Sequence, residues 1–297
     1  MSAAAMLVDF QRKQLPFPSA RFGYLRDSTD ALDDVAELRR RIAADGYLWI
    51  RGLIDRGAVL GARRGVLEHL RERDALVAGT PLMEGVMPRA GRSAGVGRAA
   101  HRPEVLRVLE GPELESFYRR FYGEEPATYG FKWLRAVGNE KFTGSHMDVV
   151  YMGRGSERVN TVWIPFGDIP VAQGTLAVCE ASHRLDSFAR IRETYGRTDV
   201  DRDRTEGWFS EDPEEISDRF GGRWLTADVS AGDVVTFGLY TLHGSTTNTT
   251  DRFRISCDVR YQPASEPMDE RWAGRTPGGH YADALVPMAE SRKRWGL

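Results

Sequence analysis

After Gly130 the chain consists of short apolar runs, each ended by glycine, proline, asparagine or aspartate. Runs of this length, rich in β-branched and aromatic residues, are typical of strands, and several in succession favour a closed or sandwiched antiparallel sheet. We therefore expect the second half of the chain to be mainly β. The predicted strands cover residues 131–137, 145–151, 159–166, 175–180, 224–229, 233–242 and 253–261.

The residues before Gly130 show helical spacing, interrupted by one strand. Apolar residues recur at helical intervals over 33–44, over 55–71 with Asp55 as a candidate N-cap, and over 104–122. Residues 47–50, Tyr-Leu-Trp-Ile, follow the helix stop Asp-Gly and predict a buried strand. We expect the helices to pack on one face of the sheet.

No stretch of linker composition divides the chain, so we expect a single domain over residues 1–297. Its predicted parts are a helical N-terminal region to about residue 125, a sheet core over about 126–265 and a tail helix over about 281–294. The Gly- and Pro-rich residues 79–100 predict a loop. The charged insert 184–222, with a short helix expected at 213–219, is either a solvated loop or a lid over a site.

Composition narrows the functional classes. A net charge of −2 and a pI near 6.3 give no basic footprint for nucleic acid, and no run of eighteen apolar residues predicts a membrane span. The N-terminus lacks the basic segment of a signal peptide, so we expect a cytoplasmic protein. Cys179 and Cys257 fall in strand-like runs and are expected to be reduced core residues.

Three potential metal ligands lie in the β-rich region. His146 and Asp148 are one residue apart in a predicted strand, where residues i and i+2 point to the same face. With the distant His243 they would form the two-histidine, one-carboxylate set of non-haem Fe(II) oxygenases, which leaves positions open for co-substrate and dioxygen. Arg254, eleven residues after His243, has a planar guanidinium that can bind one carboxylate of a dicarboxylate through two N–H groups. His183 is an alternative to His243, but no arginine follows it at a suitable spacing.

Strand alternation predicts which side chains share the face of Arg254. In residues 253–261 the odd positions are apolar and the even positions are polar. The polar face is either exposed to water or lines a ligand cavity, where Arg254 and Ser256 would lie together for a carboxylate. In residues 159–166 the same logic sets Thr161 and Trp163 on a face that could line that cavity, although a lone tryptophan is more often a core residue.

Five segments carry a resemblance to one family. They are residues 45–54 (DGYLWIRGLI), 144–148 (GSHMD), 174–184 (GTLAVCEASHR), the pair 233–237 and 243–245 (DVVTF and HGS), and 254–256 (RIS). In order and content they resemble the phytanoyl-CoA dioxygenase family of Fe(II)/2-oxoglutarate-dependent oxygenases. The resemblance spans most of the chain, with Ala181 at a position where the family usually has glycine.

The resemblance implies a double-stranded β-helix (jelly-roll, cupin-like) core with flanking helices. It implies that Fe(II) is bound by the catalytic set His146, Asp148 and His243, with dioxygen and 2-oxoglutarate as co-substrates. Arg254 would then bind the distal carboxylate of 2-oxoglutarate. Further candidates for the co-substrate pocket are Ser256, Ser245, Trp163, Thr161 and, more weakly, Lys132.

The reaction that the resemblance implies is hydroxylation of a small molecule, with release of succinate and carbon dioxide. Related halogenases lack the metal-binding carboxylate, so Asp148 favours hydroxylation over halogenation. The substrate itself is not implied, and neither is the oligomeric state. Two alternatives stay open: a metal-dependent cupin-type enzyme that does not use 2-oxoglutarate, and a non-catalytic jelly-roll binding protein.

Overall fold

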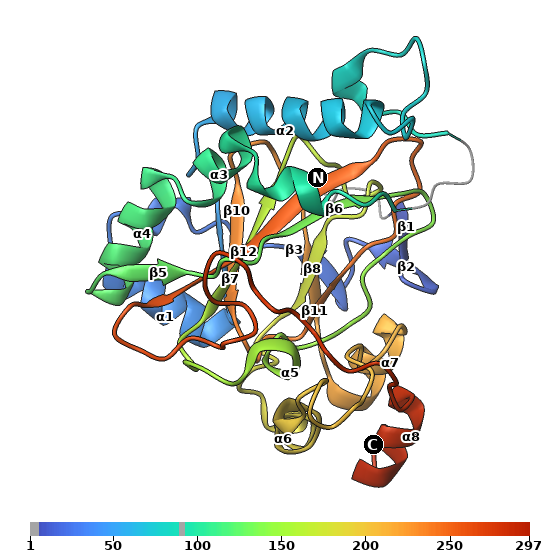
Figure 1. Cartoon of the computed structure of the whole chain (residues 1–297). Coiled ribbons are helices and arrows are strands. Elements are labelled where there is room, and N and C mark those ends of the chain that lie inside the picture. The colour runs from blue at the N-terminus through green and yellow to red at the C-terminus, as the bar shows by residue number, and fades with distance from the viewer. Residues whose placement is uncertain (1–5, 89–92) are drawn as a thin grey trace.

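The computed structural model describes residues 6–88 and 93–297, in two facing sheets with helices outside them (Figure 1). Two segments lie outside the described residues, 1–5 and 89–92. The first is part of the N-terminus that was not expected to be a signal peptide, and the second is part of the predicted loop 79–100. Among the described residues, no helix is long and apolar enough to cross a membrane.

The larger sheet is entirely antiparallel and has the strand order β4-β10-β7-β12-β5, with β6 also paired to β12. Its strands are β4 (Tyr47–Ile50), β10 (Val234–Gly238), β7 (Asn160–Pro165), β12 (Arg254–Pro263), β5 (Pro126–Thr128) and β6 (Trp133–Val137). All ten residues of β12 are buried, so its polar face is not exposed to water.

The smaller sheet has the order β11-β8-β9-β3. Its strands are β11 (His243–Ser245), β8 (Leu176–Cys179), β9 (Trp224–Thr226) and β3 (Phe22–Tyr24), the last parallel to β9. A hairpin of β1 (Met6–Phe10) and β2 (Lys13–Phe17) lies beside β3. The N-terminal region was predicted to contain helices and one strand over residues 47–50; β4 confirms that strand, but β1, β2 and β3 were not predicted.

Strand alternation divides the larger sheet into an inner and an outer face. On β10, Val235 and Phe237 point inward and pack with Trp163 of β7 and with Val178 of the smaller sheet. Val234 points outward into the core beneath the helices. Both cysteines are free and buried, as predicted: Cys179 lies in β8 and Cys257 in the helix-covered face of β12.

Four helices cover the outer face of the larger sheet (Figure 1). They are α1 (Val35–Asp45), α2 (Arg56–Arg71), α3 (Pro103–Leu109) and α4 (Pro112–Tyr122). The side chain of Asp55 caps α2 by accepting a hydrogen bond from the Ala58 amide, as predicted. The helix expected over 104–122 is two helices, because Gly111 is extended and Pro112 starts a new first turn.

The remaining helices lie at the opposite end of the molecule from α2 (Figure 1). They are α5 (Val149–Met152), α6 (Ala189–Glu193), α7 (Pro213–Phe220) and α8 (Met288–Trp295); short 3-10 turns at Asp186–Phe188 and Tyr195–Arg197 flank α6. Further 3-10 turns are Thr29–Ala31, Leu82–Glu84 and Gly97–His101. The short helix of the insert is confirmed, whereas the predicted tail helix is helical only from Met288.

A buried ion network fixes the insert to the C-terminal part of the chain. Arg271, whose side chain is 3% exposed, bonds to Asp201 of the insert and, at 2.6 Å, to Asp269. Asp201 also accepts from His280 at 2.9 Å, and Asp199 accepts from Arg154 at 2.6 Å. The insert is thus a packed part of the fold and not a solvated loop.

We expect Arg271→Leu to lower the free energy of unfolding by about 3–5 kcal/mol, because it leaves buried carboxylates without their counter-charge. Arg202→Leu is the matched control, since Arg202 is 63% exposed and its ion-pair partner Asp203 is an exposed neighbour in sequence; its cost should stay below about 1 kcal/mol. Guanidinium unfolding curves measure both values, and equal losses for the two variants would contradict this role of Arg271.

Candidate metal centre and co-substrate cavity

His146 and His243 are directly opposite one another in an antiparallel bridge. Each backbone N–H donates to the carbonyl of the other, at 2.8 Å and 2.9 Å. Residues paired in this way present their side chains on the same face of the sheet. The two imidazole rings are accordingly close together, with centroids 4.2 Å apart and planes tilted by 52°.

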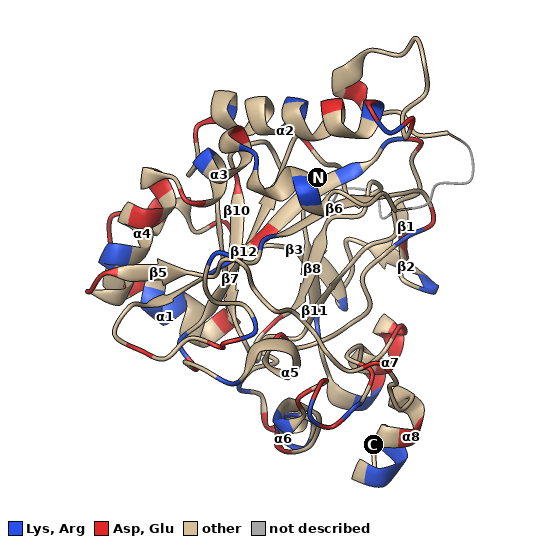
Figure 2. Cartoon of the chain, in the orientation of Figure 1, with Lys and Arg blue, Asp and Glu red and all other residues tan. Residues whose placement is uncertain are grey.

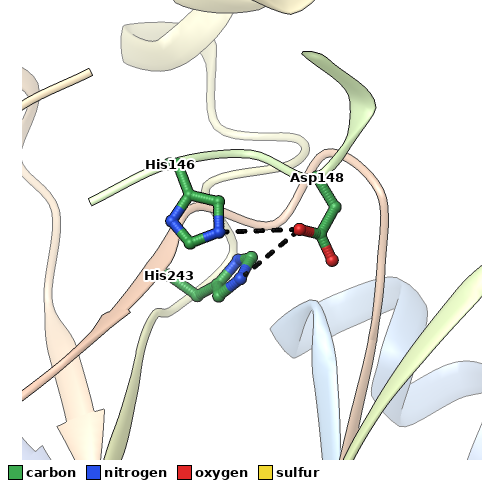
Figure 3. Close-up of side chains that lie close together, drawn as sticks. All are labelled: His146, Asp148 and His243. Atoms are coloured by element: carbon green, nitrogen blue, oxygen red, sulfur yellow. Dashed lines mark ion pairs between the residues drawn. The ribbon is translucent and has the colours of Figure 1, made fainter. Parts of the chain in front are cut away.

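Asp148 completes the cluster from the start of α5 (Figure 3). Its Oδ1 lies 3.5 Å from Nε2 of His146 and 3.8 Å from Nε2 of His243. In the part of the chain that the structure describes, these residues are the one group of three potential ligands whose atoms all lie within 4.8 Å of one another.

The predicted strand over 145–151 is wrong, although the two ligands do converge. Only Ser145 and His146 make β bridges, and Asp148 has helical dihedral angles at the N-terminus of α5. A turn after Met147, and not the alternation of a strand, therefore brings the carboxylate back toward the imidazole of His146 (Figure 3).

Hydrogen bonds orient both imidazoles with Nε2 toward the carboxylate. Nδ1 of His146 lies 2.8 Å from the carbonyl of Gly144, and Nδ1 of His243 lies 3.0 Å from that of Thr241. A carbonyl can only accept, so Nδ1 carries the hydrogen and the Nε2 lone pair is free. Burial, together with the neighbouring His146, lowers the pKa of His243 to about 4, which keeps it neutral at neutral pH.

The second carboxylate oxygen of Asp148 is occupied by protein donors. Oδ2 accepts a hydrogen bond from the Thr161 hydroxyl and one from Nη2 of Arg260 at 2.8 Å. Thr161 on β7 and Arg260 on β12 are opposite each other in the sheet, so their side chains reach the same oxygen. Burial alone would raise the pKa of Asp148, but the charge of Arg260 holds it well below its usual range.

This donor set fits Fe(II). Two imidazole nitrogens and one carboxylate oxygen face a common point, which is the facial set of non-haem iron enzymes. Because Oδ2 is held by Thr161 and Arg260, the carboxylate presents only Oδ1 to that point. One face of the ion would remain open to other ligands.

A small cavity adjoins the two histidines. It is lined by Arg135, Thr143, His146, Trp163, Leu176, His243, Gly244, Ser245, Arg254, Asp258 and Arg260. Arg254 is fully buried, and its Nη1 donates to the Ser256 hydroxyl while its Nε has no partner among the described residues. Burial lowers the pKa of Arg254 to about 10, so it is still a cation at neutral pH. A buried cation with a free donor favours an anionic ligand.

The structure places most of the predicted pocket residues at this cavity, in different roles. Trp163 and Ser245 line it directly, whereas Ser256 holds Arg254 and Thr161 bonds to Asp148. The alternative ligand His183 lies elsewhere, with Nε2 3.1 Å from the carbonyl of Ala43.

Lys132 was predicted as a weaker candidate for the co-substrate pocket, and this prediction is wrong because Lys132 does not line the cavity. Its ammonium pairs with Glu110 at 2.7 Å and donates to the carbonyl of Tyr129. It lies near Cys257, on the face of β12 that the helices cover, whereas the cavity is on the other face. Burial lowers the pKa of Lys132, opposed by Glu110.

Sequence reasoning assigned no role to Arg260, Asp258, Arg135 or Thr143, although all four line the cavity. The alternation of residues 253–261 already set Asp258 and Arg260 on the polar face with Arg254. What the sequence lacked was the register that puts Arg260 opposite Thr161 and within reach of Asp148. The guanidinium of Arg260 also lies over the ring of Trp133, 4.0 Å from its centroid, which fixes its orientation.

Comparison with known proteins agrees with this geometry. The family model for phytanoyl-CoA dioxygenase matches residues 42–256, which include the three clustered side chains and Arg254. A curated relative, the 1-deoxypentalenic acid 11-beta-hydroxylase of Streptomyces arenae, is 26% identical over 293 residues and covers 92% of each chain.

Two solved structures share the fold. The epimerase SnoN in complex with Fe3+, alpha ketoglutarate and nogalamycin RO has a TM-score of 0.55 at 18% identity, covering 86% of this chain and 98% of its own. The apo form of EctD from S. alaskensis has a TM-score of 0.56 at 18% identity, covering 97% and 96%. The predicted jelly-roll core with flanking helices is thereby confirmed. The chain belongs to the phytanoyl-CoA dioxygenase family, and with it to the non-haem oxygenases that depend on Fe(II) and 2-oxoglutarate.

Proposed function

We propose that His146, Asp148 and His243 bind Fe(II), and that Arg254, held by Ser256, binds the distal carboxylate of 2-oxoglutarate. The enzyme would hydroxylate a small organic molecule and release succinate and carbon dioxide. The observation that carries this proposal is the convergence of two free imidazole nitrogens and a single carboxylate oxygen beside a cavity that contains a buried arginine.

When bound, the iron supplies the activation of dioxygen that the side chains themselves cannot perform. The protein residues have orienting roles. Thr161 and Arg260 hold Asp148 in the position of a one-oxygen ligand, and the backbone carbonyls of Gly144 and Thr241 fix the imidazole rings. Trp163 packs among apolar side chains between the two sheets and limits access of water to the cavity.

Hydroxylation is favoured over other outcomes by two observations. The curated relatives from Streptomyces arenae and Streptomyces exfoliatus are both named hydroxylases. Asp148 fills the position that a halide would need in a halogenase. Its Oδ2 is held by a hydrogen bond from Arg260. A single-domain organisation and a cytoplasmic location, both expected from the sequence, stay predictions.

The direct test is formation of succinate from 2-oxoglutarate by the purified chain, supplied with Fe(II) under oxygen. We expect succinate and carbon dioxide in equal amounts, slowly without a substrate and faster when a substrate is found. Omission of iron should stop the reaction. A chain that binds Fe(II) but never consumes 2-oxoglutarate would instead support a cupin-type enzyme.

The role of Arg260 can be tested through metal affinity. Arg260→Met removes the hydrogen bond to Oδ2 of Asp148 and should weaken Co(II) binding about 10- to 100-fold, the usual cost of losing a residue that orients a metal ligand. Lys132→Met is the control, since Lys132 lies on the other face of the sheet. Calorimetric titration measures both variants, and equal affinity of Arg260→Met and the wild type would remove Arg260 from the site.

A further inference from the structure

A second, larger cavity of about 770 Å³ lies between the insert and the C-terminal tail. The insert contributes Val200, Asp201 and residues 206–211, and the tail contributes His280, Ala282, Leu285, Met288, Ala289 and Arg292. Tyr151 of α5 closes it on the side of the sheets. This volume is in the range of pockets that hold small organic ligands.

Tyr151 places this cavity next to the metal-binding cluster. Its ring packs edge-on against the ring of His146, with centroids 5.5 Å apart, and the same side chain forms a wall of the cavity. The insert fits tightly around this wall: a Cβ on Gly207 would lie 1.9 Å from the Tyr151 hydroxyl, and a Cβ on Gly144 would lie 2.6 Å from the ring of Trp208. The two glycines therefore allow the insert to pack against Tyr151 and against the backbone that precedes His146.

The lining of the cavity is mainly apolar, and some of it is exposed. Trp208 is 38% exposed and Leu285 is 45% exposed, although most large apolar side chains of the described chain are buried. Phe209 and Met288 lie beside them in the same lining. Exposed apolar side chains that gather in a concave site mark a place where an apolar ligand binds.

The charged groups of the lining already have partners within the protein. Arg292 pairs with Glu215 and lies over the ring of Phe209, 4.4 Å from its centroid, although its buried Nε has no partner among the described residues. Asp201 is bonded to Arg271 and to His280. Glu211 pairs with Arg12, and the carboxylate of Glu206 accepts from the Met288 amide at 2.9 Å. A ligand with several negative charges would have to compete with Glu215 for Arg292.

We infer that this cavity binds the substrate that is oxidised, and that the substrate is an uncharged, mostly apolar small molecule and not a coenzyme A thioester. The inference rests on the proposed function, because it assumes that oxidation takes place at the neighbouring cluster. The part of the lining that the tail contributes lies beyond residue 256, where the match to the family model ends, whereas Tyr151 and the insert lie within the matched segment.

Fluorescence titration with Nile red, an uncharged polycyclic dye, tests the site in the full-length chain. The wild type should bind the dye, and Leu285→Glu and Trp208→Ala should each bind it at least about tenfold more weakly, the loss expected when a buried apolar contact is removed or a charge is introduced. The matched control is Leu7→Glu on β1, where the side chain is 69% exposed and not part of the lining. Unchanged binding by both cavity variants would overturn the site.

Competition distinguishes the chemical class of the ligand. Dodecan-1-ol and dodecanoyl coenzyme A carry the same alkyl chain, and we expect the alcohol to displace the dye at a lower concentration. If the thioester displaced the dye at a lower concentration than the alcohol, the proposal of an uncharged ligand would be contradicted. A parallel Co(II) titration of the wild type separates the two proposals: loss of metal binding with normal dye binding contradicts the proposed iron centre, and normal metal binding without dye binding contradicts the cavity.

Discussion

Replacement of Asp148 by alanine is expected to abolish turnover and to weaken metal binding by at least about 100-fold, more than the loss of an orienting residue costs. The variant removes the only anionic ligand of the cluster and leaves the buried Arg260 without its partner. A divalent cation would then meet two neutral imidazoles beside an uncompensated positive charge. Co(II) titration and succinate formation measure the two losses.

Asp251→Ala is the matched control for this variant. Asp251 is also an aspartate of the β-rich region, but its side chain is 75% exposed and lies outside the cavity. It should bind Co(II) and form succinate as the wild type does. A Co(II) affinity of Asp148→Ala equal to that of the wild type would show that the carboxylate is not a ligand.

Arg254→Gln is expected to raise the KM for 2-oxoglutarate by roughly 30- to 1,000-fold, since loss of one partner of a buried charge pair costs about 2–4 kcal/mol. Glutamine keeps a hydrogen-bond donor but removes the charge that a dicarboxylate requires. The affinity for Co(II) should stay unchanged, because Arg254 does not contact the three ligands. Steady-state kinetics at varied 2-oxoglutarate, with a Co(II) titration beside it, measure both quantities.

Arg252→Gln controls for the loss of an arginine at the same end of β12. Arg252 precedes the strand, is 49% exposed and pairs with Glu84 at 3.0 Å on the surface. Its KM for 2-oxoglutarate should match that of the wild type. An unchanged KM in Arg254→Gln as well would exclude Arg254 from the co-substrate site and reopen the cupin-type alternative.

The sequence predicted that Arg254 and Ser256 share one face of a strand, because alternation in a strand is a local property; whether that face is exposed to water or lines a cavity was left open. The even residues of 253–261 share one face whatever the strand pairs with, so Arg254 and Ser256 could be placed together before the fold was known. The pairing itself depends on contacts between distant segments. For this reason the role of Arg260 at Asp148, which needs the register of β12 against β7, could not be predicted.

The segment 145–151 shows the opposite case, in which tertiary structure overrides a local preference. Val149, Val150 and Tyr151 favour a strand by residue type. In the fold the Val149 amide instead donates to the carbonyl of Leu239, and the Tyr151 amide donates to that of Asp148. These bonds form the turn that brings Asp148 toward His146, and no spacing rule indicates them.

The N-terminal strands were missed for a related reason. β3 pairs in parallel with β9, whose residues lie some two hundred positions later in the sequence, and β1 and β2 lie beside it. Three to five residues are too few to show a clear period. Charge gave no further guide to the site, since Lys and Arg are interspersed with Asp and Glu over the outer helices (Figure 2).

The most direct test of the central claim is an anaerobic titration of the chain with Fe(II), followed by 2-oxoglutarate, monitored by visible absorption. One equivalent of Fe(II) should bind, and added 2-oxoglutarate should produce a charge-transfer band that neither component gives alone. The His243→Ala variant should not bind the equivalent of Fe(II) and should not give the charge-transfer band. A wild-type chain that binds no iron, or a His243→Ala variant that gives the same band, would contradict the assignment of the metal centre.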